Sequence, residues 1–194
     1  SITSETFTYW AEQNTTSYPA NSDKVMYIKT IYSSSFTNMP VPYSNLKQRF
    51  LQNRVSYTIR DADGQDASTY DQTTTIYSYD PHGNVEWVLQ KVPTMLTEID
   101  YPSHLISKID YEYDLISGNV LKVTYNKNRS DEFFYKYEYD EDNRLQKVKT
   151  SRGGEIWDRD AEYDYYLHGP LKRIAIGEDS LQGVDYVYTI QDWL

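Results

Sequence analysis

Apolar and polar residues alternate along most of the second half of the chain. Between Ser107 and Asp114, aromatic or aliphatic side chains take every second position with charged side chains between them, and residues 131–140 repeat the arrangement. A period of two residues is typical of a β-strand with one buried and one solvated face. Each run ends at an Asp, passes a short break, and continues into a second strand-like run, at 119–125 and 144–150. The pattern predicts two successive β-hairpins.

The breaks share the composition of a tight turn. In Asp80-Pro81-His82-Gly83-Asn84, Asp comes first, Pro second and Gly fourth, which favours a type I turn followed by a left-handed residue. We expect the Asp carboxylate to accept hydrogen bonds from backbone N–H groups of the turn. Asn replaces Gly in the fourth predicted turn, and the fifth is two residues longer. The predicted turns are Asp61–Gly64, Asp80–Gly83, Asp114–Gly118, Asp140–Asn143 and Asp164–Gly169.

The spacing of these turns predicts a repeat architecture. The five Asp residues lie 19, 34, 26 and 24 positions apart, and periods of 20 to 50 residues indicate stacked units that bury their faces on one another. We predict an all-β fold, an antiparallel array of β-hairpins forming a curved, spiralling sheet segment. At most one short helix is expected, near 44–53, where Ser44 could act as its N-cap; an irregular strand is the alternative reading of that segment.

Two regions are expected. Residues 1–53 predict an irregular N-terminal segment with one strand, packed on the sheet, and residues 54–194 predict the hairpin array. The last alternating run continues to Leu194 without a return strand, so we expect the chain to be a piece of a longer polypeptide, truncated within the array. An unpaired apolar edge strand is a template for another chain, which predicts edge-to-edge self-association of the fragment.

Recurring Tyr-Asp pairs followed by Gly-Asn-Val or Asn-Arg-Leu resemble the YD-repeat, or Rhs-repeat, family, in a version common in large Bacteroidetes surface proteins. The resemblance covers about residue 54 to the C-terminus. It implies a ribbon of β-hairpins that spirals into a hollow shell, as in toxin-complex subunits. The motif positions it assigns are Tyr79, Asp80, Gly83, Asn84, Tyr113, Asp114, Gly118, Asn119, Tyr139, Asp140, Asn143, Tyr163, Asp164 and Gly169.

Composition adds three constraints. The chain holds 21 Tyr but 5 Phe, and its mean hydropathy is -0.76; tyrosine suits a half-buried sheet face, where the ring packs and the hydroxyl reaches water or a partner. A net charge of -10 argues against nucleic acid and anionic membranes as partners. No stretch is long and apolar enough to span a membrane, and the absence of cysteine excludes disulfides and thiolate metal sites.

The residues that could carry chemistry favour a non-catalytic protein. No second ligand at metal-binding spacing accompanies His82, His104 or His168. The acidic residues of 61–66 are spaced as in a calcium-binding loop, but the later bidentate Glu of such a loop is missing. No nucleophile motif or phosphate-binding loop occurs. A glycosidase pair of carboxylates has no support from spacing in so acidic a chain. We therefore expect no enzyme activity, no cofactor and no metal.

Two functions from different classes follow. The resemblance implies a structural wall segment of a shell that encloses or presents a C-terminal effector, in a secreted or cell-surface protein, with the rest of its own polypeptide as partner. The alternative is a carbohydrate-binding module at a cell surface, since exposed aromatic rings can stack on sugars. The candidate stacking residues are Trp10, Trp87 and Trp157.

Overall fold

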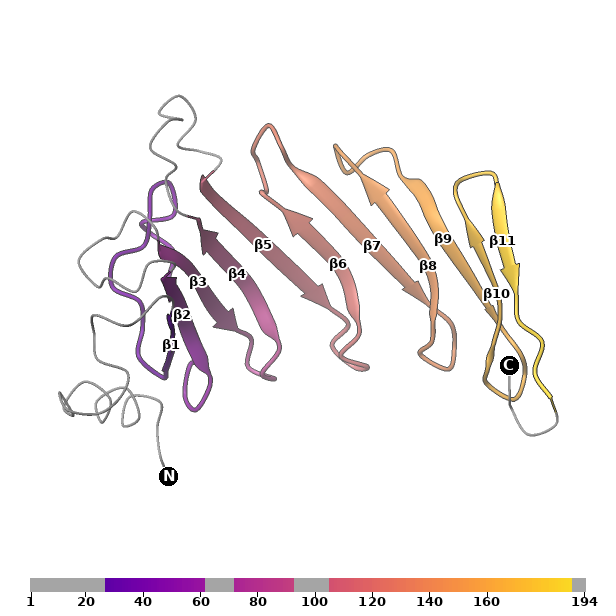
Figure 1. Cartoon of the computed structure of the whole chain (residues 1–194), viewed down its shortest axis with the longest axis horizontal. Helices are drawn as coiled ribbons and strands as arrows, with labels where there is room; N and C mark the ends of the chain where they lie inside the picture. Colours follow the sequence, from indigo (N-terminus) through magenta and orange to yellow (C-terminus); the bar gives the residue numbers. More distant parts are fainter. Residues whose placement is uncertain (1–26, 62–71, 93–104, 190–194) are drawn as a thin grey trace. The chain divides into compact units, whose positions relative to one another are not determined.

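The computed structural model describes residues 27–61, 72–92 and 105–189. These residues form eleven strands, which follow one another in chain order through an antiparallel sheet (Figure 1). The described residues contain no α-helix, so the predicted all-β fold is confirmed. The strands are β1 (Tyr27–Tyr32), β2 (Val55–Asp61), β3 (Gln72–Tyr79), β4 (Val85–Lys91), β5 (Ile106–Tyr113), β6 (Val120–Tyr125), β7 (Phe133–Tyr139), β8 (Leu145–Ser151), β9 (Asp158–Tyr165), β10 (Leu171–Ile176) and β11 (Gln182–Asp185).

The chain divides into two compact units, Ser1–Ile109 and Asp110–Leu194, with the division inside β5. Each unit is described by itself below. The division at residue 53 that the sequence suggests stays a prediction, because residues 1–26 lie outside the described part of the chain.

The first unit has the better developed hydrophobic core. Its centre is a cluster of buried side chains from consecutive strands, and Leu89 is completely inaccessible. Partly buried apolar side chains of the segment 33–53 pack against this cluster, and Figure 1 shows the segment as a purple trace beside β1, β2 and β3. One sheet face therefore has a lid of irregular chain. The cluster is Ile76, Trp87, Leu89 and Ile106, and the packing residues of the segment are Phe36, Met39, Tyr43 and Leu46.

No helix forms near 44–53, in keeping with the expectation of at most one short helix in that segment. The side chain of Gln48 instead reaches into the sheet, where its amide donates to the carbonyl oxygens of Ser56 at 2.8 Å and Tyr77 at 2.7 Å and its oxygen accepts from the Phe36 N–H at 2.6 Å. Phe50 has a φ of 52°, which a right-handed helix excludes. The segment is thus held by tertiary hydrogen bonds that outweigh a weak helical tendency.

The second unit is a run of antiparallel hairpins with two chemically different faces. Cross-strand neighbours share a face, and one row across β6–β9 is Val123, Tyr135, Thr150 and Asp158. The next row on this face is Tyr137, Val148, Ala161 and Ile176. The opposite face carries the row Lys122, Lys136, Lys149 and Arg159.

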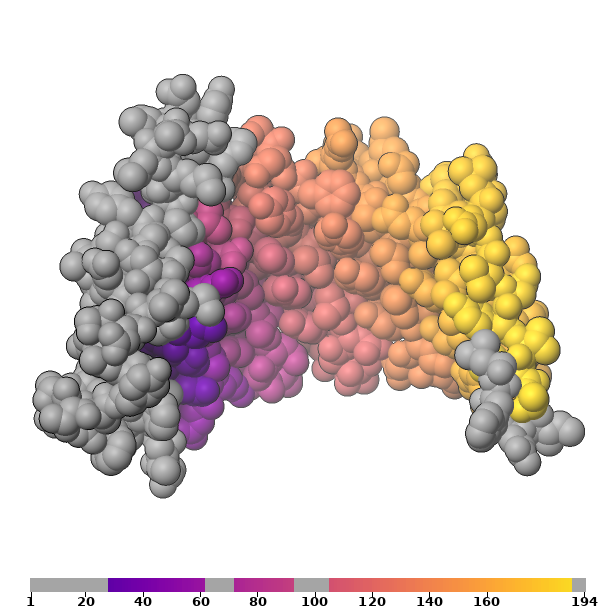
Figure 2. All heavy atoms as spheres, viewed as in Figure 1, coloured from indigo at the N-terminus to yellow at the C-terminus, as the bar shows by residue number. Residues whose placement is uncertain are grey.

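Ion pairs offset the repulsion within that cationic row. Glu138 lies 2.7 Å from the Lys149 ammonium and 3.7 Å from that of Lys136, and Glu162 binds both Arg159 and Lys147. The Lys149 ammonium, by its hydrogen bond, holds the pKa of Glu138 below its usual value. Figure 2 shows one face of this unit, orange to yellow, with no other described segment laid over it. The unit is therefore a sheet with a charged face and a face rich in tyrosine.

Asp61 is the last residue of β2 and pairs with Gln72, while residues 62–71 lie outside the described part of the chain, so the turn expected at Asp61–Gly64 is not tested. No helix in the described residues is long and apolar enough to cross a membrane.

Candidate functional site

The turn between β3 and β4 shows how an Asp closes a hairpin. The backbone N–H of Gly83 donates to the Asp80 carbonyl, and that of Asp80 donates to the Asn84 carbonyl. One carboxylate oxygen of Asp80 accepts from the N–H groups of Gly83 and Asn84, at 2.7 and 2.8 Å. Gly83 has a φ of 100°, which side-chain-bearing residues rarely adopt. The acidic side chain thus satisfies donors that the turn leaves free.

Two further turns repeat this arrangement. The Asp140 carboxylate accepts from the Arg144 N–H at 2.9 Å, with Asn143 at a φ of 61° in the glycine position. The Asp114 carboxylate accepts from the N–H and the hydroxyl of Ser117, at 2.8 and 2.6 Å, and this turn holds one more residue before its glycine, Gly118. The three Tyr-Asp pairs at 79–80, 113–114 and 139–140 therefore each lead into a turn tied by the Asp.

The pKa values of these carboxyls reflect the same bonds. Burial disfavours the ionised form of Asp80, but hydrogen bonds from the side chain and backbone of Asn84 outweigh it and hold its pKa below the usual value. In Asp140 burial is likewise outweighed, here by the backbone and guanidinium of Arg144, and its pKa is lowered. The hydrogen bonds of Ser117 lower the pKa of Asp114. All three turns are thus tied by an ionised carboxylate at neutral pH.

The turn between β9 and β10 begins at a different residue from the one that the sequence predicted. Asp164 lies inside β9 opposite Arg173, and the turn is closed by Tyr166, whose carbonyl accepts from Gly169 and whose N–H donates to Pro170. This turn has the length of those at Asp80 and Asp140, so Tyr165 takes the position of the motif tyrosine and Tyr166 that of the Asp. The sequence pattern chose Tyr163-Asp164 because that is the local Tyr-Asp pair, but strand pairing sets the register.

Motif tyrosines make a second, non-local contact that sequence reasoning did not find. The hydroxyl of Tyr79 donates to the carbonyl of Val55 at 2.8 Å, that of Tyr139 to Val120 at 2.9 Å, and that of Tyr165 to Leu145 at 2.7 Å. Each acceptor is the first residue of the neighbouring strand, β2, β6 or β8. We call this contact the tyrosine latch.

The latch takes a carbonyl that the strand ladder leaves free. The register pairs end at Tyr57↔Ile76 in β2–β3, at Lys122↔Lys136 in β6–β7 and at Lys147↔Glu162 in β8–β9, in each case two residues short of the latch carbonyl. At each of these carbonyls, a tyrosine hydroxyl donates in place of a backbone N–H of the neighbouring strand.

Arginine side chains cover two of the latch rings. The Arg54 guanidinium lies 5.4 Å from the centroid of the Tyr79 ring, and that of Arg144 lies 4.6 Å from the Tyr165 ring. Arg144 also donates to Asp140 at 2.7 Å, so one residue links a turn carboxylate to the latch of the next hairpin. Desolvation by burial raises the pKa of Tyr79, Tyr139 and Tyr165, which keeps each hydroxyl protonated as a donor.

The sequence candidates for chemistry are not brought together. His82 is exposed, 4.0 Å from the Asp80 carboxylate, and His168 is exposed with its ring 5.4 Å from that of Tyr166; His104 lies outside the described residues. Within the described residues, no group of three or more His, Cys, Asp or Glu side chains could hold a metal ion.

Two of the three proposed sugar-stacking tryptophans lie in the described residues, and neither is fully exposed. Trp87 is 4% exposed and belongs to the core of the first unit, so its ring has no free face. Trp157 is half-buried, with its ring 6.3 Å from that of Phe134 and its indole N–H donating to the Gly154 carbonyl at 3.1 Å. Trp10 lies outside the described residues. Alternation alone could not tell the covered face of β4 from an open one.

Comparison with known proteins gives a coarse likeness of strand arrangement. No family profile matches the sequence, and no curated protein is significantly similar to it. Similar solved structures include TcdB2-TccC3 without its hypervariable C-terminal region, 13% identical over 84% of this chain with a TM-score of 0.47, and TcdB2-TccC3-Cdc42, 12% identical over 84% with the same TM-score. This chain spans 9% of the length of each of those chains.

Proposed function

We propose that this chain is a non-catalytic wall segment of a YD-repeat, or Rhs-type, shell, in a secreted or cell-surface protein. Its role is to continue a ribbon of hairpins that encloses or presents an effector segment of the same polypeptide. The observation that carries the proposal is the tyrosine latch, because it joins one hairpin to the next through the same two positions at Tyr79, Tyr139 and Tyr165.

The use of the polar motif residues supports a structural role. The carboxylates of Asp80, Asp114 and Asp140 accept hydrogen bonds from N–H groups of their turns, and the latch hydroxyls donate to strand carbonyls. A catalytic group needs a donor or acceptor directed at a substrate, and these groups are instead directed at other groups of the chain itself. The motif therefore builds hairpins, and its repetition extends the array.

The two faces of the second unit also suit a wall. Lys149, Glu138 and Arg159 belong to a face of paired charges that tolerates water, and on the opposite face Tyr135 is exposed and Tyr137 is half-buried. A sheet whose two faces both tolerate solvent needs no thick core. Such a sheet can separate an outside from an inside.

The test is made on the polypeptide encoded by the complete open reading frame that contains this chain. We expect cryo-electron microscopy to show a hollow particle with these hairpins in its wall, and a protease to spare the enclosed segment while the wall is intact. A solid or extended particle would contradict the proposal. So would a C-terminal segment cleaved as fast in the intact protein as when it is produced alone.

A further inference from the structure

A pocket of about 370 Å³ opens in the second unit, at the loop between β8 and β9. This volume lies at the lower end of the range for small-molecule sites. The lining includes one aromatic, one aliphatic and three charged side chains, which are Phe133, Ile156, Arg152, Glu155 and Asp158. The pocket therefore offers apolar contact together with charges of both signs.

The loop that frames the pocket is fixed by its own hydrogen bonds. The hydroxyl of Ser151 accepts from the Gly154 N–H at 2.8 Å, and the indole N–H of Trp157 donates to the Gly154 carbonyl at 3.1 Å. Where the two strands meet, Thr150 and Asp158 are direct cross-strand neighbours, so the register of β8 and β9 fixes their spacing. A pocket whose frame is already ordered loses less conformational entropy when a ligand binds.

The three charged side chains of the pocket have no partner among the described residues. The side chains of Arg152, Glu155 and Asp158 make no hydrogen bond or ion pair there, and all three residues are exposed. By contrast, Arg159, which follows Asp158 in β9, is bound to Glu162. The pocket thus holds one cationic group and two anionic groups that are available to a ligand.

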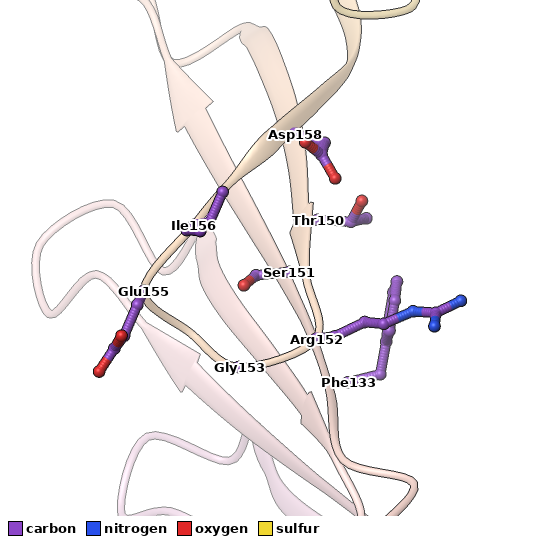
Figure 3. A pocket seen from close by; sticks show the side chains of 8 residues that line it. All are labelled: Phe133, Thr150, Ser151, Arg152, Gly153, Glu155, Ile156 and Asp158. Carbon is purple, nitrogen blue, oxygen red and sulfur yellow. The ribbon is translucent and has the colours of Figure 1, made fainter.

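The placement of these charges limits the kind of ligand. Figure 3 shows Arg152, Phe133 and Asp158 projecting to one side, whereas Glu155 extends from the opposite limb of the loop. A small ion would pair with groups of one sign only and would be repelled by the other. A ligand that satisfies all three groups needs an anion and a cation close together, and a second cation at the end of an apolar stem. A basic α-amino acid has this arrangement.

We propose that this pocket binds a free basic α-amino acid such as lysine. The ligand carboxylate pairs with the Arg152 guanidinium, whose planar fork suits a carboxylate, and the α-ammonium donates to Asp158. The methylene stem of the ligand lies against Phe133, and its terminal cation reaches Glu155. The ligand carries one more positive group than negative and the pocket carries the reverse, so their charges are complementary. This site is independent of the wall function.

Isothermal titration calorimetry with L-lysine and L-arginine tests the proposal, and both are expected to bind. Three analogues of L-lysine each lack one of its charged groups. L-norleucine lacks the side-chain cation, cadaverine lacks the carboxylate, and Nα-acetyl-L-lysine lacks the α-ammonium. Each analogue should bind about tenfold more weakly than L-lysine or worse, since a hydrogen bond between charged groups is lost.

Three variants assign each charged group of the ligand to its partner. Glu155→Gln should lose the preference for L-lysine over L-norleucine, Arg152→Gln the preference over cadaverine, and Asp158→Asn the preference over Nα-acetyl-L-lysine. Lys172→Ala and Asp179→Asn remove charges at exposed positions outside the pocket, and both should bind L-lysine as the parent does. Melting temperatures equal to that of the parent should show that all five variants are folded.

The proposal is overturned if neither L-lysine nor L-arginine binds at concentrations up to about 10 mM, or if L-norleucine binds as tightly as L-lysine. It is equally overturned if Glu155→Gln keeps the full preference of the parent. Weakening of L-lysine binding in Asp179→Asn to the same extent as in Glu155→Gln would also overturn it, because the overall charge of the chain would then govern binding rather than the pocket.

Discussion

The hydroxyl of Tyr139 donates a hydrogen bond of 2.9 Å to the carbonyl of Val120, on the neighbouring strand. Tyr139 ends β7, and Val120 begins β6 beyond the last register pair of the two strands. Phenylalanine could supply the ring but not the bond. The same relation at Tyr79 and Tyr165 explains in part why the chain uses 21 tyrosines and 5 phenylalanines.

Replacing Asp80 by Ala tests the turn carboxylate. The variant leaves the N–H groups of Gly83 and Asn84 without their acceptor, and capping oxygens of this kind stabilise by about 0.5–2 kcal/mol. We expect urea unfolding to show a loss in that range. Asp164→Ala is the control, because Asp164 is exposed within β9 and ties no turn; it should change the free energy of unfolding by less than about 0.5 kcal/mol. Equal losses in both variants would contradict the corrected motif.

Replacing Gly83 by Ala tests the left-handed turn position. A Cβ at Gly83 would meet the Arg54 guanidinium at 2.5 Å, and the φ of 100° is unfavourable for any side chain. We expect a loss of about 1–2 kcal/mol, the usual cost of left-handed backbone in a residue with a Cβ, or more if Arg54 has to leave the Tyr79 ring. Gly153→Ala has open space and no positive φ and should be nearly neutral. If thermal unfolding ranks the two substitutions the other way, the turn geometry is wrong.

Replacing Gln48 by Ala tests what holds the segment 33–53 on the sheet. The change removes the donor to the carbonyls of Ser56 and Tyr77 and the acceptor for the N–H of Phe36. Unsatisfied buried groups cost about 1–3 kcal/mol each, so we expect the amides of 33–53 to exchange with solvent faster than those of β3 and β4. Gln52→Ala, at an exposed position, should leave hydrogen exchange unchanged. Uniform acceleration across the unit would mean that the segment does not detach by itself.

The raised tyrosine pKa values predict a loss of stability in alkali. Burial raises the pKa of Tyr79, Tyr137, Tyr139 and Tyr165 above the ordinary value of 10.0. At a pH between the tyrosine pKa of the unfolded chain and the higher tyrosine pKa of the folded chain, these hydroxyls are ionised in the unfolded chain but still protonated in the folded one. The free energy of unfolding therefore falls as the pH rises through this range. The stabilisation that these four tyrosines contribute is complete below pH 10 and should decline above it. Melting temperatures measured between about pH 8 and 11 would show this decline. A variant with Phe at all four positions should decline less steeply; an identical decline would assign the effect to other groups.

Patterns among neighbouring residues predicted the hairpins, whereas contacts between residues far apart in the sequence determine the conformation of the segment near 44–53. The alternation around Tyr111 and Tyr137 and the turn composition at Asp80 and Asp140 depend on neighbouring residues only, and they located strands and turns correctly. The sequence left a short helix and an irregular strand open for residues 44–53, and it could not decide between them because Gln48 finds its partners 8 and 29 residues away. Such distances leave no periodic trace in a single sequence.

The fifth motif and the choice of Trp87 as a stacking residue failed for related reasons. Tyr165-Tyr166 lacks the Asp that identifies the motif, so only the pairing of β9 with β10 reveals its register. Trp87 lies in a strand whose pattern shows which residues share a face, but not that the segment 33–53 covers that face. The latch acceptors could not be predicted either, because a backbone carbonyl carries no sequence signal.

One measurement tests the central claim, that motif tyrosines join successive hairpins through their hydroxyls. A triple variant changes Tyr79, Tyr139 and Tyr165 to Phe. Its matched control changes Tyr77, Tyr137 and Tyr163 to Phe, each two residues earlier on the same strand and, in the described part of the chain, with no hydrogen bond from its hydroxyl.

Urea unfolding of both variants should show a clear difference. Each lost latch leaves a strand carbonyl without its donor, at a cost of about 0.5–1.5 kcal/mol, so the latch variant should lose about 1.5–4.5 kcal/mol if the three sites add. The control should stay within about 1 kcal/mol of the parent. Equal free energies of unfolding for the two variants would contradict the latch as the link between hairpins.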